Sequence, residues 1–163
     1  MTNAPSSLPE RSRVVQDHVR AAGLDAEVRV LPDSARTAAE AAAALGCSVG
    51  AIGNSLIFLA DDQPVLVMTS GAHRVDPDIL AGAIGATTVA MAPADVVRAV
   101  TGQAIGGVAP VGHPEPLRTI VDAALRAHPV VWTAGGTPHT VMPLGFEELV
   151  ALTDGTVAIV SAD

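Results

Sequence analysis

The chain has 163 residues, of which 49% are apolar and 16% are charged, and this composition excludes an intrinsically disordered protein. Its nine basic residues are all arginines, and the absence of lysine excludes a Walker A phosphate loop, a pyridoxal enzyme and a Schiff-base aldolase. The net charge of −8 argues against a broad, sequence-independent grip on nucleic acid, but it leaves room for contact with one end of an RNA.

The length predicts a single domain, which we place over residues 7–163. Residues 1–6 before it are expected to form a flexible tail. The single cysteine, Cys47, permits no internal disulfide, and the N-terminus has no apolar signal core. No apolar run is long enough to span a membrane without interruption by glycine, proline or charge. We therefore expect a cytoplasmic protein that binds neither membranes nor DNA.

Capping signals predict the first helices. Ser7 and Glu10 have the spacing of a capping box, and Thr37 and Glu40 repeat it. Each helix should end at the glycine that follows its last apolar residue. The two helices are expected over 7–22 and 37–45. A strand is expected over 27–31, and a further helical turn over 48–52.

Residues 51–68, AIGNSLIFLADDQPVLVM, are predicted to form a hairpin. The apolar runs 55–59 and 65–68 are strand patterns, and the polar residues 61–64 between them are typical of a turn. Asn54 stands at the head of the first strand, which makes its amide a candidate for chemistry. The alternative is a side chain that only bonds to the local backbone.

The second half of the chain also mixes helices with strands. Helices are expected over 77–84, 93–100, 122–127 and 146–152, and strands over 87–91, 118–121, 130–133, 140–144 and 156–160. Two of those strands flank a Gly-Gly turn and should form a second hairpin. Hairpins argue against a purely parallel, doubly wound sheet, so the sequence predicts a mixed α/β (α+β) fold around a curved sheet.

The segment GGVAP is the most informative candidate site, and its residues are Gly106, Gly107, Val108, Ala109 and Pro110. Glycines allow a backbone to approach a ligand closely, and successive free N–H groups can hold an oxyanion or a carbonyl oxygen. The alternative is an ordinary tight connection between a helix and a strand. The segment is not a dinucleotide-binding fingerprint, because no strand, G-x-G-x-x-G and helix follow one another there.

Other polar residues give weaker signals. His113 in the glycine-rich loop and His139 at the head of a strand are candidates for a hydrogen bond to a substrate. No histidines or cysteines have the spacing of a metal site, and no nucleophile elbow is present. Asp122 is expected to cap the short helix that follows it, with substrate binding as the alternative.

Taken in order, these motifs resemble the YbaK and prolyl-tRNA editing family. The strings TAAEAAAALGCSVGAIGNSLIF, TGQAIGGVAPVG and TAGGTPHTVMPL carry the resemblance, which covers roughly residues 25–160. The most specific mark is G-x-x-x-P, from Gly106 to Pro110. The resemblance implies a mixed domain with a curved, barrel-like sheet flanked by helices. It also implies hydrolysis of the ester between a wrong amino acid and the terminal adenosine of a tRNA, without a metal or another cofactor.

The resemblance also implies a site in which the amides of the glycine loop hold the aminoacyl carbonyl and a small pocket selects the amino acid by size. The catalytic residues expected are Asn54, Gly106 and Gly107, and the substrate-binding residues are Val108, Ala109, Pro110, His113, Asp122, Gly135 and His139. In an enzyme, one pocket should bring together Asn54, Gly106 to Pro110, Gly135 and His139. The substrate expected is tRNA-Pro carrying a small amino acid such as alanine or cysteine. The partners expected are the 3′ end of an aminoacyl-tRNA and prolyl-tRNA synthetase.

One position departs from the family pattern. Asn54 stands where the family has a lysine that contacts the substrate near the reacting end, and an amide is shorter and neutral. Three outcomes stay open. The amide replaces the ammonium group in an active deacylase, or an arginine such as Arg36 or Arg74 enters the site, or the site binds its ligand without hydrolysing it.

Overall fold

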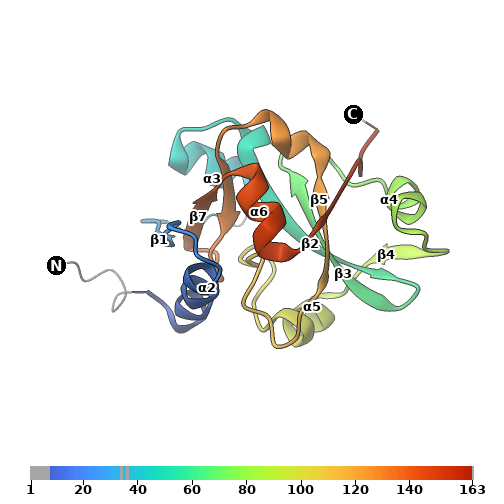
Figure 1. Ribbon diagram of the computed structural model, residues 1–163, viewed down its shortest axis with the longest axis horizontal. Helices are drawn as coiled ribbons and strands as arrows, with labels where there is room; N and C mark the ends of the chain where they lie inside the picture. Colours follow the sequence, from blue (N-terminus) through green and yellow to red (C-terminus); the bar gives the residue numbers. More distant parts are fainter. Residues whose placement is uncertain (1–7, 34, 36, 163) are drawn as a thin grey trace.

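The fold is described by a computed structural model over residues 8–33, 35 and 37–162 (Figure 1). The expected tail over 1–6 and the capping residue Ser7 lie outside the described residues. The helices are α2 (Glu10–Ala21), α3 (Ala38–Leu45), α4 (Pro77–Ile84), α5 (Ala94–Thr101) and α6 (Phe146–Thr153), with the 3-10 helices η1 (Val49–Ala51) and η2 (Ala123–Ala127). The strands are β1 (Arg29–Val30), β2 (Ile52–Ala60), β3 (Gln63–Ser70), β4 (Val89–Met91), β5 (Arg118–Asp122), β6 (Val131–Ala134), β7 (Thr140–Leu144) and β8 (Thr156–Ala158).

Helix α3 begins and ends as its sequence predicts. The Glu40 amide donates to Thr37 Oγ1 at 3.1 Å, and the Thr37 amide donates to Glu40 Oε1 at 3.2 Å, which confirms the capping box. The helix ends where Gly46 takes a left-handed φ of 69°. Helix α2 differs at its start, because it begins at Glu10 with Pro9 as its N-cap.

The mixed fold is confirmed, and its sheet is open. The strand order is β1-β7-β6-β2-β3-β5-β8, with β4 paired to β2 beside this path. The pairs β2–β3, β6–β7, β1–β7 and β2–β4 are antiparallel, and β2–β6, β3–β5 and β5–β8 are parallel. Within the described residues the two end strands do not pair with each other, so the barrel-like sheet expected from the resemblance is not closed.

Both predicted hairpins form, but the turn of the first is shorter than expected. Asp61 and Asp62 make the turn alone, with φ values of 48° and 68°. Two left-handed residues in a row suit the twist of a tight hairpin, and aspartate tolerates this conformation better than most side chains do. The predicted turn over 61–64 was therefore too long, because Gln63 and Pro64 already belong to β3.

The edge of β2 has a gap between its partners, and this gap positions the candidate site. Strand β6 pairs with Ile52 and Gly53, and β4 pairs with residues 58–60. Between them, residues 54–57 have no strand beside them on that edge within the described part of the chain. Asn54 is thus the third residue of β2, at the point where its partner strand changes.

Two clusters of buried side chains cover the two faces of the sheet. The larger one contains Val15 and Val19 of α2, Val97 of α5 and Leu149 of α6. The smaller one contains Phe58 of β2, Val67 of β3 and Leu80 of α4. Figure 1 shows α2, α5 and α6 apart from α4, which lies next to β4. Because side chains alternate along a strand, consecutive residues of β2 point to different clusters.

Candidate functional site

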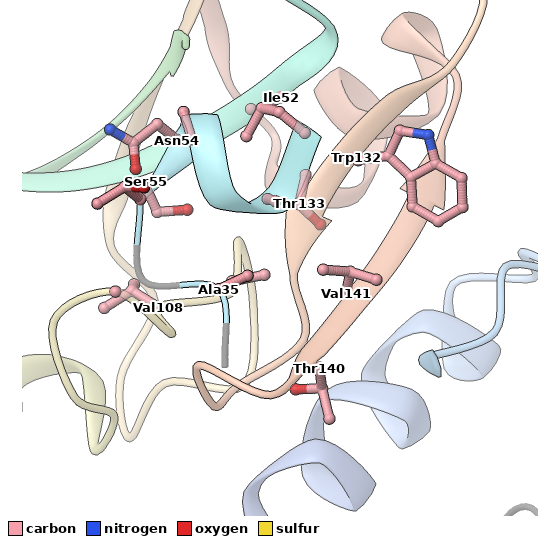
Figure 2. A pocket seen from close by; sticks show the side chains of 15 residues that line it. Ala35, Ile52, Asn54, Ser55, Val108, Trp132, Thr133, Thr140 and Val141 are labelled. Atoms are coloured by element: carbon pink, nitrogen blue, oxygen red, sulfur yellow. The ribbon is translucent and has the colours of Figure 1, made fainter. Parts of the chain in front are cut away.

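A pocket with an enclosed volume of about 40 Å³ lies where β2, β6, α3 and the glycine loop over residues 102–112 meet (Figure 2). Most of its lining residues are small, and we name it the small-residue pocket after them: Ala35, Ala38, Ala41, Gly53, Ser55 and Ala134. Gly106 and Val108 close it from the loop side, and Thr133 and Val141 close it from β6 and β7. Such a space fits a small side chain and excludes a large one.

Asn54 and Ser55 leave β2 in opposite directions. Asn54 pairs with Thr69, and Ser55 pairs with Met68 in the register of β2 and β3. In Figure 2 the Ser55 hydroxyl points to the side of the strand where Thr133 and Val108 lie, and the Asn54 amide points away from them. The Asn54 side chain makes no hydrogen bond within the described part of the chain, so its amide is available to a ligand.

From Gly106 to Ala109, available and hydrogen-bonded backbone amides alternate along the glycine loop. The Gly107 amide donates to the Ala104 carbonyl at 2.9 Å, and the Ala109 amide donates to Gln103 Oε1 at 2.7 Å. The amides of Gly106 and Val108 have no hydrogen-bond partner among the residues that the structure describes. Gly106 and Val108 are also the loop residues that line the small-residue pocket.

Gly107 has a packing role in the same loop. A Cβ atom at this position would lie 2.6 Å from the backbone nitrogen of Pro138, which no real Cβ tolerates. The glycine loop therefore rests directly on the backbone of residues 137–138, and only glycine permits this approach. Ala109 and Pro110 are buried behind the pocket and do not line it.

Thr133 is a candidate that the sequence analysis missed. Its side chain is 1% exposed, it lines the small-residue pocket, and its hydroxyl has no partner among the described residues. Buried hydroxyls nearly always form hydrogen bonds, so an unpartnered one in a pocket wall points to a ligand. The only sequence signal is its place in the strand before the Gly-Gly turn.

The predicted histidine sites lie outside the pocket lining. His139 is exposed at the start of β7. His113 donates from Nε2 to the Ala109 carbonyl at 2.9 Å and so supports the glycine loop from behind. Burial lowers the pKa of His113 below its ordinary value of 6.5, and the bond to Ala109 offsets part of that shift. His113 is therefore a neutral side chain near pH 7.

Gly135 and Asp122 also lie outside the lining of the small-residue pocket. A Cβ at Gly135 would lie 2.8 Å from Val28, so this glycine permits close packing under β7. Asp122 is 2% exposed and caps η2 by accepting from the Ala124 amide at 2.9 Å, as its position predicts. Its other oxygen accepts from Thr69 Oγ1 at 3.1 Å.

A second hollow lies on the other side of Asn54. Arg74, one of the two arginines expected to enter the site, lines it together with His73, and Arg36 lies outside the described residues. Within the described ranges, no group of three or more acidic, histidine or cysteine side chains could hold a metal ion. No described helix has the length and hydropathy needed to cross a membrane.

Comparisons with known proteins agree with the sequence motifs. Residues 32–152 match the family model of the aminoacyl-tRNA editing domain. The chain is 34% identical over 110 residues to a proline–tRNA ligase of Bacillus licheniformis, an alignment that covers 65% of this chain and 19% of the ligase. It is 27% identical over 136 residues to the uncharacterized protein YwhH of Bacillus subtilis, which covers 83% of this chain and 86% of YwhH.

A solved structure extends the match over nearly the whole chain. A candidate trans-editing enzyme for prolyl tRNA synthetase is 40% identical and superposes with a TM-score of 0.90, covering 96% of this chain and all of that one. By contrast, the chain spans only about a fifth of the length of the proline–tRNA ligases that it matches, at 17% and 19%.

Proposed function

The chain belongs to the aminoacyl-tRNA editing domain family, and from this premise we propose that it is a trans-editing deacylase for mischarged tRNA. It hydrolyses the ester that joins an amino acid to the terminal ribose. The observation that carries this proposal is a coincidence in the glycine loop. The two loop residues that line the small-residue pocket, Gly106 and Val108, both have amides without a hydrogen-bond partner among the described residues.

The available amides suit the transition state of ester hydrolysis. Water adds to the carbonyl carbon, and the developing oxyanion accepts hydrogen bonds from the amides of Gly106 and Val108. The bond between the carbonyl carbon and the ribose oxygen then breaks, and that oxygen takes a proton. The products are a free amino acid and a tRNA with a free terminal hydroxyl. An ester is already labile, so orientation and oxyanion binding supply a useful acceleration.

Side chains around the pocket select the amino acid. The alanines of α3 and Ala134 leave room for a small side chain, and Val141 limits its length. Thr133 offers its unpartnered hydroxyl to the bound amino acid. Alanine and cysteine fit this space. The substrate proposed is tRNA-Pro carrying one of them, since the relatives include proline–tRNA ligases and a candidate trans-editing enzyme for prolyl tRNA synthetase.

A partner protein would bind the body of the tRNA in place of this chain. With a net charge of −8 and only nine basic residues, the chain has few groups that could bind the phosphates of a long polyanion. We therefore propose that prolyl-tRNA synthetase presents the tRNA, and that this chain contacts only its 3′ end. Asn54 replaces the family lysine as a neutral hydrogen-bond donor beside the ester.

The test is a deacylation assay with purified protein and tRNAs charged with alanine, cysteine, serine, threonine or proline. We expect release of alanine or cysteine from tRNA-Pro, retention of proline, and loss of turnover in Asn54→Ala. Turnover that appears only in Asn54→Lys would contradict the proposal, because it would mean that the native chain binds its ligand without hydrolysing it.

A further inference from the structure

The second hollow has a volume of about 470 Å³, and we name it the His73 hollow. Its polar lining residues are Asn54, Thr69, His73 and Arg74. We propose that the His73 hollow binds the phosphate of the 3′-terminal nucleotide of the RNA, with Arg74 as its main cation. This inference rests on the proposed function, because that function supplies the RNA end.

The two spaces share one lining residue. Asn54 lines both the small-residue pocket and the His73 hollow. The gap on the edge of β2 over residues 54–57 leaves no strand between them on that side within the described residues. An aminoacyl ester in the small-residue pocket therefore has its ribose beside Asn54, and the 5′ side of that ribose leads toward the His73 hollow.

Arg74 supplies positive charge to the His73 hollow. Arg74 is exposed, and its guanidinium forms no ion pair within the described residues. Guanidinium groups match the geometry of a phosphate through paired N–H donors. In a chain with only nine basic residues and a net charge of −8, an arginine at this hollow is a local source of positive charge.

His73 lies against the buried carboxylate of Asp122. Its Nδ1 is buried and lies 3.4 Å from Oδ2 of Asp122, while a fifth of the side chain is exposed. Asp122 is itself fixed by the amides of Ser70 at 3.0 Å and Ala124 at 2.9 Å. The imidazole thus has one edge toward the carboxylate, and the side chain lines the His73 hollow as a further polar group.

Apolar side chains complete the hollow on its other side. Leu56, Val75 and Met91 line it, and Met91 is 61% exposed. An exposed thioether beside an arginine is a suitable surface for a nucleobase, whose planar face can pack on polarizable or planar groups. A site with an arginine, an oriented histidine and an apolar wall fits a nucleotide better than a free inorganic anion.

The test uses a non-hydrolysable ligand, 3′-alanylamino-3′-deoxyadenosine, with and without a 5′-phosphate. Isothermal titration calorimetry on the native protein should give about tenfold tighter binding of the phosphorylated form, which corresponds to about 1.4 kcal/mol. Arg74→Gln should remove this preference and leave the affinity for the unphosphorylated form unchanged. Arg98→Gln is the matched control, because Arg98 is an exposed arginine of α5 outside both spaces, and it should keep the preference.

The variant His73→Gln is a second test of phosphate binding in the His73 hollow. It should weaken binding of the phosphorylated form only, and Asp122 keeps its other partners, so the fold should persist. Equal binding of the two ligands by the native protein, or a preference that survives in Arg74→Gln, would overturn the inference. Deacylation of tRNA without any phosphate preference would overturn the inference alone and leave the proposed function standing. A phosphate preference without deacylation would support the site and count against the proposed function.

Discussion

The two sides of Asn54 differ in both size and chemistry. On one side lies the small-residue pocket, with alanines, Thr133 and the available amides of Gly106 and Val108. On the other lies the His73 hollow, with a histidine and an arginine. The first side offers neutral donors in a confined space. The second offers charge at the surface.

A single strand produces this division. Successive side chains of β2 point to opposite faces, so the Ser55 side chain points into the small-residue pocket, while Asn54 borders that pocket and directs its side chain toward the His73 hollow. A ligand with an amino acid at one end and a phosphate near it meets both sides at once. The comparison therefore assigns recognition of the amino acid to one face and recognition of the nucleotide to the other.

The largest effect on deacylation should come from displacing the glycine loop of the small-residue pocket by a substitution at Gly107. In Gly107→Ala the new Cβ collides with the backbone of residues 137–138, and the loop must move. We expect a loss of about 1–3 kcal/mol in the free energy of unfolding and about a hundredfold loss in kcat/KM for deacylation. Chemical denaturation and the deacylation assay measure the two effects.

Gly82→Ala is the matched control for that variant. Gly82 lies inside α4 with no atom within 4 Å of its added Cβ, so alanine should stabilise the helix by about 0.5–1 kcal/mol and leave kcat/KM unchanged. Equal activity losses in the two variants would contradict the role given to the glycine loop.

A charge placed between the two sides should have the next largest effect. Asn54→Asp puts a carboxylate beside the ester, where it repels both the oxyanion and the phosphate. At a separation of about 8 Å and an effective dielectric constant of about 20, this repulsion is about 2 kcal/mol, or roughly a thirtyfold loss in kcat/KM. Gln63→Glu makes the same charge change at the exposed end of β3 and should leave kcat/KM as it is.

Removing the Thr133 hydroxyl tests whether it contacts the bound amino acid in the small-residue pocket. Thr133→Val keeps the shape and should lower kcat/KM about tenfold, with little change in stability, because the hydroxyl has no partner within the described residues. Thr119→Val should behave in the opposite way. Thr119 donates to the Leu117 carbonyl at 3.0 Å, so its loss should cost about 1 kcal/mol of stability and no activity.

The smallest expected effect concerns the support behind the glycine loop. Because the pKa of His113 is lowered in the folded state, the unfolded chain binds a proton more readily than the folded chain does. Stability should therefore be unaffected by this group above its ordinary value of 6.5, and it should fall as the pH drops from there toward the lowered value. Thermal unfolding between pH 5 and pH 8 measures this. The fall should be smaller in His113→Gln, and an identical profile in both proteins would contradict it.

The sequence predicts elements well where local chemistry decides them. The capping box at Thr37 and Glu40 and the left-handed Gly46 fix α3 without help from the rest of the fold. The strand expected over 27–31 shrinks to Arg29–Val30, because only these residues pair with β7. The turn at Asp61 and Asp62 was misjudged because a tight hairpin placed aspartates in a conformation that usually selects glycine.

Features of the site depend on contacts between distant segments, which a local pattern does not contain. Motifs identified Asn54 and the glycine loop, yet the direction of Asn54 follows from the register of β2 with β3. The availability of the Gly106 and Val108 amides depends on where Ala104 and Gln103 bond. Thr133 becomes a candidate only once the fold shows that its hydroxyl has no partner among the described residues, and Arg74, already a candidate, is placed in the His73 hollow only by the fold.

The division of one ligand between the two sides of Asn54 can be tested in a single crystal structure. The protein would be crystallised with 3′-alanylamino-3′-deoxyadenosine 5′-phosphate. The account predicts that the alanyl carbonyl lies within hydrogen-bond distance of the Gly106 and Val108 amides, with the methyl group in the small-residue pocket and the phosphate at Arg74. An alanyl group in the His73 hollow, or a phosphate remote from Arg74, would contradict it.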